Sequence, residues 1–232
     1  MTRPLCVVFD CDGVLLDSNR MKTQVFGDIL STYPPDAVDA FLAYQTTAFG
    51  LSRYRMIDTF FERYLGRAAI DGEKDMLLAS FSKECRQRYP CQALTEGTME
   101  TLETFDRHDI PMFVVSGSDE IELISVLEEM GLARFFRRIF GSPSTKTDNI
   151  ARVIALLDRP HDITFVGDAK ADWLASCERG CDFIYLATWA ADPATMQTLQ
   201  HKHGFKEISR LPDLLEYLAL AAPEAAASKD AM

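Results

Sequence analysis

The chain has 232 residues, of which 47% are hydrophobic and 25% charged, and its formal net charge is −11. These are ordinary values for a soluble globular protein, and a chain of this length can bury a full core without disulfides or a structural metal. The acidic balance and the lack of any basic run argue against nucleic acid or an anionic membrane surface as a partner. A site for a phosphorylated ligand would need local cations to reverse the overall field.

The cysteine pattern bears on metal content and location. The six cysteines form no CxxC pair, and only Cys177 and Cys181 have a spacing that could offer two metal ligands from one helix. Because zinc sites usually take three or four protein ligands, we expect reduced thiols rather than a zinc site. The first residues, MTRPLCVVFDCDG, resemble neither a signal peptide nor a membrane span. We therefore predict a cytoplasmic protein, with an oligomeric state that the sequence leaves open.

Short apolar runs alternate with longer amphipathic stretches along the chain. The predicted strands are Leu5–Asp10, Pro111–Ser116, Arg138–Phe140, Ile163–Gly167 and Phe183–Ala187. The predicted helices after residue 90 are Glu96–His108, Ser118–Met130, Thr147–Leu157, Ala169–Arg179 and Leu211–Ala221. Brief strands that are apolar on both faces are typical of a buried parallel sheet. The alternation predicts an α/β fold, a Rossmann-like doubly wound parallel sheet with helices on both faces.

Residues 19–90 interrupt this alternation. No convincing strand occurs there, and helices are predicted at Asp36–Ala48, Ser52–Leu65 and Glu73–Arg88, with prolines and glycines marking the turns. We expect four helices in this range, inserted after the first strand as a separate module. The low-complexity end of the chain, residues 223–232, is predicted to be a flexible tail.

Polar residues gather where the predicted strands end. They are Asp10, Asp12, Ser116, Lys146, Asp168 and Asp172. Carboxyl ends of parallel strands share one edge of the sheet, so the topology brings these side chains together. Taken singly, Asp168 could be a helix N-cap and Asp172 a solvated helix residue. A cluster of four carboxylates, however, loses hydration and repels itself unless a cation neutralises it, and oxygen ligands suit Mg²⁺ above all.

Four segments resemble, in the right order, the motifs of the haloacid dehalogenase-like hydrolase superfamily. FDCDGVLLDS matches its DxDGxxxDS signature, and VVSGS is similar to its second motif, a hydrophobic strand ending in Ser or Thr. Lys146 stands at the place of the third-motif lysine, and VGDAKAD resembles GDxxxD. The resemblance is to the phosphatase and β-phosphoglucomutase-like branch. It implies a catalytic core of residues 1–18 and 91–222, with residues 19–90 as an α-helical cap.

The resemblance implies a role for each matching acid. Asp10 would attack phosphorus and form an aspartyl-phosphate, and Asp12 would act as general acid and base. Mg²⁺ would be bound by the Asp10 carboxylate, the Asp12 backbone carbonyl and Asp168. Asp172 would act on the metal through water or by orienting its direct ligands.

Further matching residues would bind the substrate. Ser116, the Gly117 N–H and Lys146 would contact the phosphoryl group, and Gly13 would let the loop backbone approach it. Within residues 19–90, FGLSRYRM resembles a loop of the β-phosphoglucomutase branch whose arginine grips the distal anionic end of the substrate. Arg53 would have that role, although a surface arginine near a helix start is the alternative.

The leading hypothesis is a Mg²⁺-dependent phosphatase acting on a small phosphorylated metabolite, a sugar phosphate or a phosphoglycolate-like acid. The true dehalogenases of the superfamily lack the second aspartate, so Asp12 favours phosphoester chemistry. A β-phosphoglucomutase-like phosphomutase uses the same motifs, although Lys22 stands where several relatives place a histidine near the hinge. A non-catalytic binding protein is a third alternative, and the intact motifs weigh against it.

Overall fold

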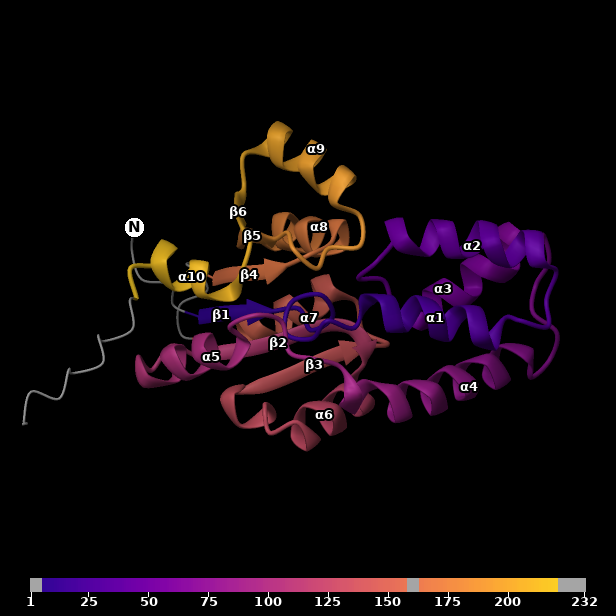
Figure 1. Ribbon diagram of the computed structural model, residues 1–232, viewed down its shortest axis with the longest axis horizontal. Helices are drawn as coiled ribbons and strands as arrows, with labels where there is room; N and C mark the ends of the chain where they lie inside the picture. The colour runs from indigo at the N-terminus through magenta and orange to yellow at the C-terminus, as the bar shows by residue number, and fades with distance from the viewer. Residues whose placement is uncertain (1–5, 158–162, 221–232) are drawn as a thin grey trace, which may run out of the picture.

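One parallel sheet organises the molecule. The structure is a computed structural model that describes residues 6–157 and 163–220 (Figure 1). Within these residues the strands follow the order β3-β2-β1-β4-β5-β6, and every neighbouring pair is parallel. The strands are β1 (Cys6–Phe9), β2 (Met112–Asp119), β3 (Arg138–Ser142), β4 (Ile163–Gly167), β5 (Asp182–Leu186) and β6 (Lys206–Ile208). The predicted α/β fold with a parallel, doubly wound sheet is confirmed.

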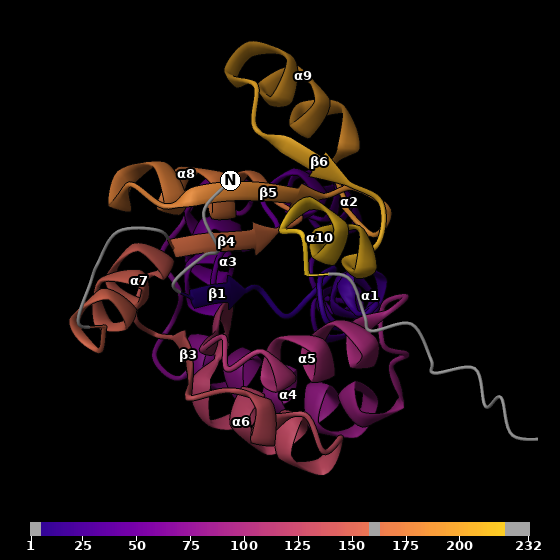
Figure 2. The ribbon, with the colours of Figure 1, turned by 90° about the vertical axis from the view of Figure 1, so that its left-hand side faces the viewer.

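Helices cover both faces of the sheet (Figure 2). One face carries α7 (Lys146–Ala155), α8 (Lys170–Arg179) and α9 (Pro193–His203), and the other carries α5 (Thr98–Arg107), α6 (Glu120–Glu129) and α10 (Leu211–Tyr217). Successive residues of the central strand β1 point to opposite faces, as strand geometry requires. Val8 packs in the cluster under α7 and α8, whereas Val7 and Phe9 pack in the cluster that includes α5 and α6. Both faces of β1 are therefore buried.

Four helices follow β1 before the chain reaches α5: α1 (Asn19–Ile29), α2 (Pro35–Thr47), α3 (Arg53–Thr59) and α4 (Glu73–Arg88). A π-helical turn, η1 (Phe60–Tyr64), continues α3. Figure 1 shows these helices as a lobe beyond the arrowheads of the strands. Aromatic rings hold the lobe together, since Phe26 contacts Phe41 and Phe81 at centroid distances of 5.4 and 4.5 Å. We refer to this lobe as the cap and keep its limits at residues 19 and 90 as a prediction.

Three local features differ from the sequence-based expectations. Helix α9 and strand β6 were not predicted, because α9 buries only Met196 and β6 is a three-residue edge strand with two exposed polar residues. Strand β2 runs to Asp119 instead of ending at Ser116, and α6 begins at Glu120 rather than at Ser118. The reason is an N-cap: the Asp119 carboxylate accepts the Glu122 N–H at 3.2 Å. The predicted tail lies outside the described residues.

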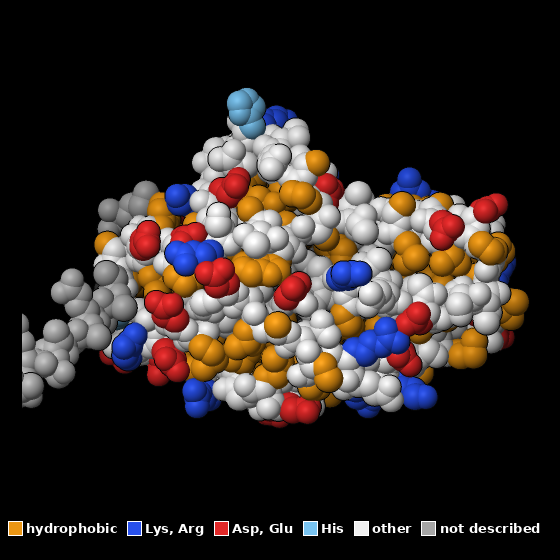
Figure 3. All heavy atoms as spheres, viewed as in Figure 1, with side chains coloured by type: hydrophobic (Ala, Val, Ile, Leu, Met, Phe, Trp, Pro, Cys, Tyr) orange, Lys and Arg blue, Asp and Glu red, His pale blue; other side chains and the backbone are white. Residues whose placement is uncertain are grey.

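Charge distribution and helix length were the two features behind the expected absence of nucleic-acid and membrane partners. On the face in Figure 3, Lys and Arg side chains are scattered among acidic ones and do not gather in one patch. Among the described helices, none has both the length and the apolar character needed to cross a membrane.

Candidate active site

The site lies where the strand order reverses. From the central strand β1 the chain runs to β2 and β3 on one side of the sheet, whereas β4, β5 and β6 lie on the other side. Ligands of open parallel sheets bind at such a switch point, outside the carboxyl ends of the strands. Asp10 and Asp12 directly follow β1, Asp168 directly follows β4, and Ser116 lies in β2. The topology thus brings together acids that are more than 150 residues apart in sequence.

Three buried carboxylates form a compact cluster. Asp10, Asp168 and Asp172 each place one oxygen within 4.8 Å of the others. Burial, together with the charges of Asp172 and Asp10, raises the pKa of Asp168 well above its ordinary range. The Asn19 Nδ2 donates to Asp168 at 2.7 Å, while the buried Asn19 Oδ1 has no hydrogen-bond partner among the described residues. Crowded carboxylates beside an unpaired acceptor fit a hard divalent cation and its bound water, so these residues fit Mg²⁺.

A buried lysine partly offsets the cluster. The Lys146 Nζ donates to Asp10 Oδ2 at 2.8 Å and also contacts Asp172 Oδ1. Burial would lower the pKa of Lys146, but the charges of Asp10 and Asp172 raise it above its ordinary value, so the ammonium stays protonated. The other Asp172 oxygen accepts the Ala169 N–H at 3.0 Å. Asp172 therefore orients Lys146 and the first turn of α8, whose N-cap is Ala169 and not Asp168.

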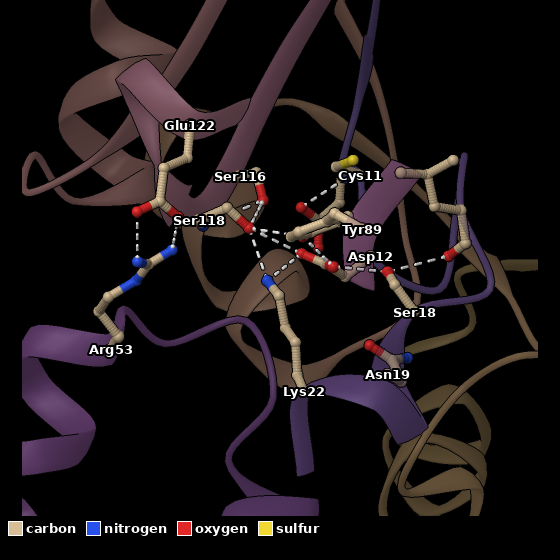
Figure 4. A network of polar contacts seen from close by, with 12 residues as sticks. Cys11, Asp12, Ser18, Asn19, Lys22, Arg53, Tyr89, Ser116, Ser118 and Glu122 are labelled. Carbon is tan, nitrogen blue, oxygen red and sulfur yellow. Dashed lines mark hydrogen bonds and ion pairs between the residues drawn. The ribbon is translucent and has the colours of Figure 1, made fainter. Parts of the chain in front are cut away.

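The carboxylate of Asp12 has a different environment (Figure 4). It accepts hydrogen bonds from the hydroxyls of Ser18 at 2.6 Å and Ser118 at 2.8 Å, and also from the Tyr89 hydroxyl and the Lys22 ammonium. Burial would raise the pKa of Asp12, but the charge of Lys22 and the hydrogen bonds from Lys22, Ser18 and Tyr89 lower it. Asp12 is thus held as a carboxylate by two core hydroxyl groups, a cap lysine and a cap-end tyrosine.

The loop after β1 turns sharply at Gly13. This residue has a φ of +75°, a region that favours glycine, and its N–H donates to the Leu16 carbonyl at 2.7 Å. A Cβ at this position would collide with the Asp168 carboxylate and the Asn19 amide. Gly13 therefore allows the backbone to lie directly against the acidic cluster.

The cap backbone touches the core directly over the site. A Cβ on Gly117 would lie 2.5 Å from the Gly50 carbonyl oxygen, which belongs to the loop between α2 and α3. Ser116 is buried beside it, and its Oγ accepts the Ser118 N–H at 3.2 Å. The cap is therefore closed on the phosphoryl-binding residues that the sequence predicts.

Closure leaves a small cavity of about 30 Å³. Pockets for small molecules usually enclose roughly 300–1,000 Å³, so the cap must move to admit a metabolite. Six of the sequence-predicted site residues line the cavity: Asp10, Asp12, Arg53, Ser116, Gly117 and Asp168. Lys146 and Asp172 do not line the cavity: Lys146 contacts Asp10, and Asp172 contacts Lys146.

Arg53 lies in the cavity wall with its guanidinium already occupied. Nη1 donates to Ser82 and to Glu122 Oε1, each at 2.9 Å, and Nη2 donates to Glu122 Oε2 at 2.6 Å. The guanidinium also lies over the Phe81 ring, 4.7 Å from its centroid. Its neighbour Arg55 is exposed. The sequence pointed to Arg53 without indicating its acidic partner on α6.

Several residues of this site were missed by the sequence reasoning. They are Ser18, Asn19, Tyr89, Ser118 and Glu122. Ser18 and Ser118 end the recognised segments FDCDGVLLDS and VVSGS, and Asn19 directly follows the first of them, so their positions carried a signal. Tyr89 is 77 residues from Asp12 in sequence, and no local pattern links the two.

A parallel sheet with buried carboxylates at its switch point, a buried lysine and an inserted helical cap defines an α/β protein with an enclosed candidate active site. A model of the haloacid dehalogenase-like hydrolase family matches residues 7–186. The chain belongs to this family, which confirms the resemblance seen in its motifs.

Three individual proteins show how similar this chain is to its relatives. Phosphoglycolate phosphatase 1 of Pseudomonas aeruginosa is 28% identical over 195 residues, which cover 76% of this chain and 67% of that one. A phosphoglycolate phosphatase of Rhodobacter capsulatus is 23% identical over 230 residues, 90% and 96% of the two chains. The crystal structure of a predicted phosphatase from Clostridium acetobutylicum aligns over 95% of this chain and all of the other, with a TM-score of 0.75 and 17% identity. At that identity the structural likeness shows the fold alone.

Proposed function

We propose that this protein is a Mg²⁺-dependent phosphatase that hydrolyses a small phosphorylated metabolite through an aspartyl-phosphate on Asp10. The observation that carries this proposal is the buried cluster of Asp10, Asp168 and Asp172 with Lys146 on Asp10. The phosphoglycolate phosphatases among the relatives support the reaction class. The substrate would be a sugar phosphate or a phosphoglycolate-like acid.

Two donors orient the carboxylate of Asp10, which would attack phosphorus. The Cys11 N–H donates to one carboxylate oxygen at 2.7 Å, and Lys146 donates to the other at 2.8 Å. Mg²⁺ would be held by Asp10, Asp168 and the Asp12 carbonyl. Asp172 would orient Asp10 through Lys146. When bound, the ion neutralises charge on the carboxylate and the phosphoryl oxygens.

The phosphoryl group would meet four further groups of this chain. Ser116 and the Gly117 N–H would hydrogen-bond its oxygens, Lys146 would neutralise charge, and Gly13 would let the loop approach. Arg53 would contact the leaving group from the cap. Ser116, Lys146 and Arg53 are buried, and such interactions are stronger in a buried site than in solution.

Asp12 would move the proton in both half-reactions. It would give a proton to the leaving alkoxide, and the resulting carboxylate would then take a proton from the water that attacks the aspartyl-phosphate. The hydrogen bonds from Ser18, Ser118 and Tyr89 keep the carboxylate beside the cavity. A phosphoryl dianion next to Asp12 would raise its pKa and favour the protonated form needed for the first half-reaction.

We also propose a cytoplasmic location. All six cysteines are free, and Cys6, Cys11 and Cys85 are buried. Free thiols persist in reducing compartments, where structural disulfides are rare.

The first experiment is phosphate release from a panel of phosphorylated sugars, small acids and nucleotides, with Mg²⁺ and with EDTA. We expect turnover of one or a few compounds, abolished by EDTA and by Asp10→Asn. The variant should stay folded, because it removes a charge from a repulsive cluster, and circular dichroism would check this. Near-wild-type activity of Asp10→Asn would disprove the nucleophile assignment. Activity only with a bisphosphate activator would favour the phosphomutase. No activity on any compound of the panel would favour a binding protein.

A further inference from the structure

The cations that line the cavity are both paired with carboxylates of the core. Lys22 contacts Asp12, and Arg53 contacts Glu122. The Arg53 and Glu122 side chains are only 4% and 11% exposed, so water screens neither charge effectively. The part of the cavity beside Arg53 therefore carries no net charge from the Arg53–Glu122 pair.

The Arg53–Glu122 pair has the geometry of a strong interaction. Both guanidinium Nη atoms donate to the two carboxylate oxygens, at 2.9 and 2.6 Å, as in a bidentate pair. Figure 4 shows Glu122 and Arg53 facing each other across the cap–core boundary. Ser82 and the Phe81 ring fix the guanidinium from α4. Arg53 would thus be costly to separate from Glu122.

The remaining wall on this side offers little to an anion. Its apolar members are Phe26, Phe49, Leu51, Met56 and Phe81. Gln45 and Asn19 add neutral amides to the lining. Hydroxyl groups can bond to amides and need no counter-charge, whereas a buried carboxylate does need one.

We propose that Glu122 makes this site select phosphomonoesters whose leaving group is an uncharged alcohol, such as a sugar or polyol, over those whose leaving group carries a carboxylate. This inference rests on the proposed phosphatase function. A substrate carboxylate would either lack a counter-charge or take Arg53 and leave Glu122 buried without a partner, and both are unfavourable. The preference would separate this chain from its relatives named phosphoglycolate phosphatase.

Two pairs of substrates of matched size test the proposal: glycerol 3-phosphate against 3-phosphoglycerate, and 2-hydroxyethyl phosphate against 2-phosphoglycolate. With the wild type and Mg²⁺, we expect kcat/KM to be at least about tenfold higher for the alcohol in each pair. Glu122→Gln keeps the shape of the side chain and releases Arg53 from its counter-charge. It should raise kcat/KM for the carboxylates about tenfold and change the alcohols by less than about threefold.

Glu128→Gln is the matched control, because Glu128 is exposed on the same helix and should leave both ratios unchanged. A wild type that prefers the carboxylate substrates would overturn the proposal. A Glu122→Gln variant with a lower kcat/KM for the carboxylates would also overturn it, because Glu122 would then orient Arg53 for the substrate anion. If Glu122→Gln fails to fold, the kcat/KM ratios of the wild type for the two substrate pairs still test the proposal. Hydrolysis of p-nitrophenyl phosphate reports on the reaction class separately: its absence would contradict the proposed function, and this inference with it.

Discussion

Asp12 and Asp168 are both buried, yet their pKa values move in opposite directions. Burial favours the neutral acid in both. At Asp12 the charge of Lys22 and several donors outweigh burial, whereas at Asp168 the neighbouring acids Asp172 and Asp10 add to it. Groups whose pKa values are pushed apart in one site commonly have different roles. The two buried acids thus have different surroundings, and we propose different roles for them, proton transfer for Asp12 and metal binding for Asp168.

Gly13→Ala tests how closely the loop must approach the cluster. The added methyl group would displace the Asp168 carboxylate, and small displacements of such groups can cost about a hundredfold in rate. We expect kcat/KM to fall by about that factor and the Mg²⁺ concentration for half-maximal activity to rise. Gly131→Ala is the control, since Gly131 has a φ of +71° but nothing within 4 Å of the added Cβ. It should lose only about 1 kcal/mol of stability. Equal activity in the two variants would refute the close-approach argument.

At the scale of single elements, the start of α4 depends on one glutamate. The Glu73 carboxylate accepts hydrogen bonds from both Nη atoms of Arg67 at 2.8 Å, from the Ile70 N–H at 2.9 Å and from the Tyr33 hydroxyl at 2.8 Å. The hydrogen bonds from Arg67, followed by that from Ile70, lower the pKa of Glu73 to about 2. These contacts tie the loop before α4, and the turn between α1 and α2, to the helix.

The depressed pKa of Glu73 predicts a pH-dependent cap. The ordinary pKa of a glutamate is 4.5, so as pH falls the unfolded chain takes up this proton before the folded chain does. The stabilisation of the folded state by ionised Glu73 is therefore full above about pH 4.5 and is lost as pH falls towards 2. Glu73→Gln should lower Tm at neutral pH and flatten the change of Tm between pH 4.5 and 2. Asp75→Asn, an exposed acid in the same helical turn, controls for the helix dipole. Parallel Tm profiles for wild type and Glu73→Gln would contradict this account.

At the scale of the whole molecule, four cap residues meet the core along one segment, residues 117–122. Gly50 touches Gly117, and Lys22 contacts Ser118 with an Nζ–Oγ distance of 2.6 Å. The Tyr54 hydroxyl donates to Asp119 at 2.7 Å, and Arg53 pairs with Glu122. Because this segment continues directly from Ser116, which we propose to bind the phosphoryl group, closure of the cap would also complete the proposed site.

Gly50→Ala should impede this closure. The added Cβ would lie 2.9 Å from the Ala171 Cβ and 3.2 Å from the Lys146 Nζ, and a shift of the cap away from the core would relieve the contact. We expect kcat/KM to fall on the order of tenfold while the chain stays folded. Gly66→Ala has the same type of backbone strain, at φ +65°, but no neighbour within 4 Å. If the two variants are equally active, the Gly50 contact does not control closure.

The strand positions and the main acids could be predicted from local patterns. Buried parallel strands such as β1 and β4 are continuous apolar runs, and their carboxyl ends are determined by where the polar residues begin. Helix α9 and strand β6 escaped prediction, because an edge element buries little and its pattern of apolar residues is weak. The end of β2 was misplaced, because the capping bond of Asp119 is made only once the helix exists.

The sequence by itself determined the fold class, the family and the acids of the cluster, since these depend on periodicity and on short motifs within single segments. Only the tertiary structure decided the partners of those residues. The four donors on Asp12 come from three separate parts of the chain, and the pairing of Arg53 with Glu122 joins residues 69 positions apart. Side-chain pairs of this kind depend on how the cap and the core fold against each other, and no local sequence pattern encodes that distance.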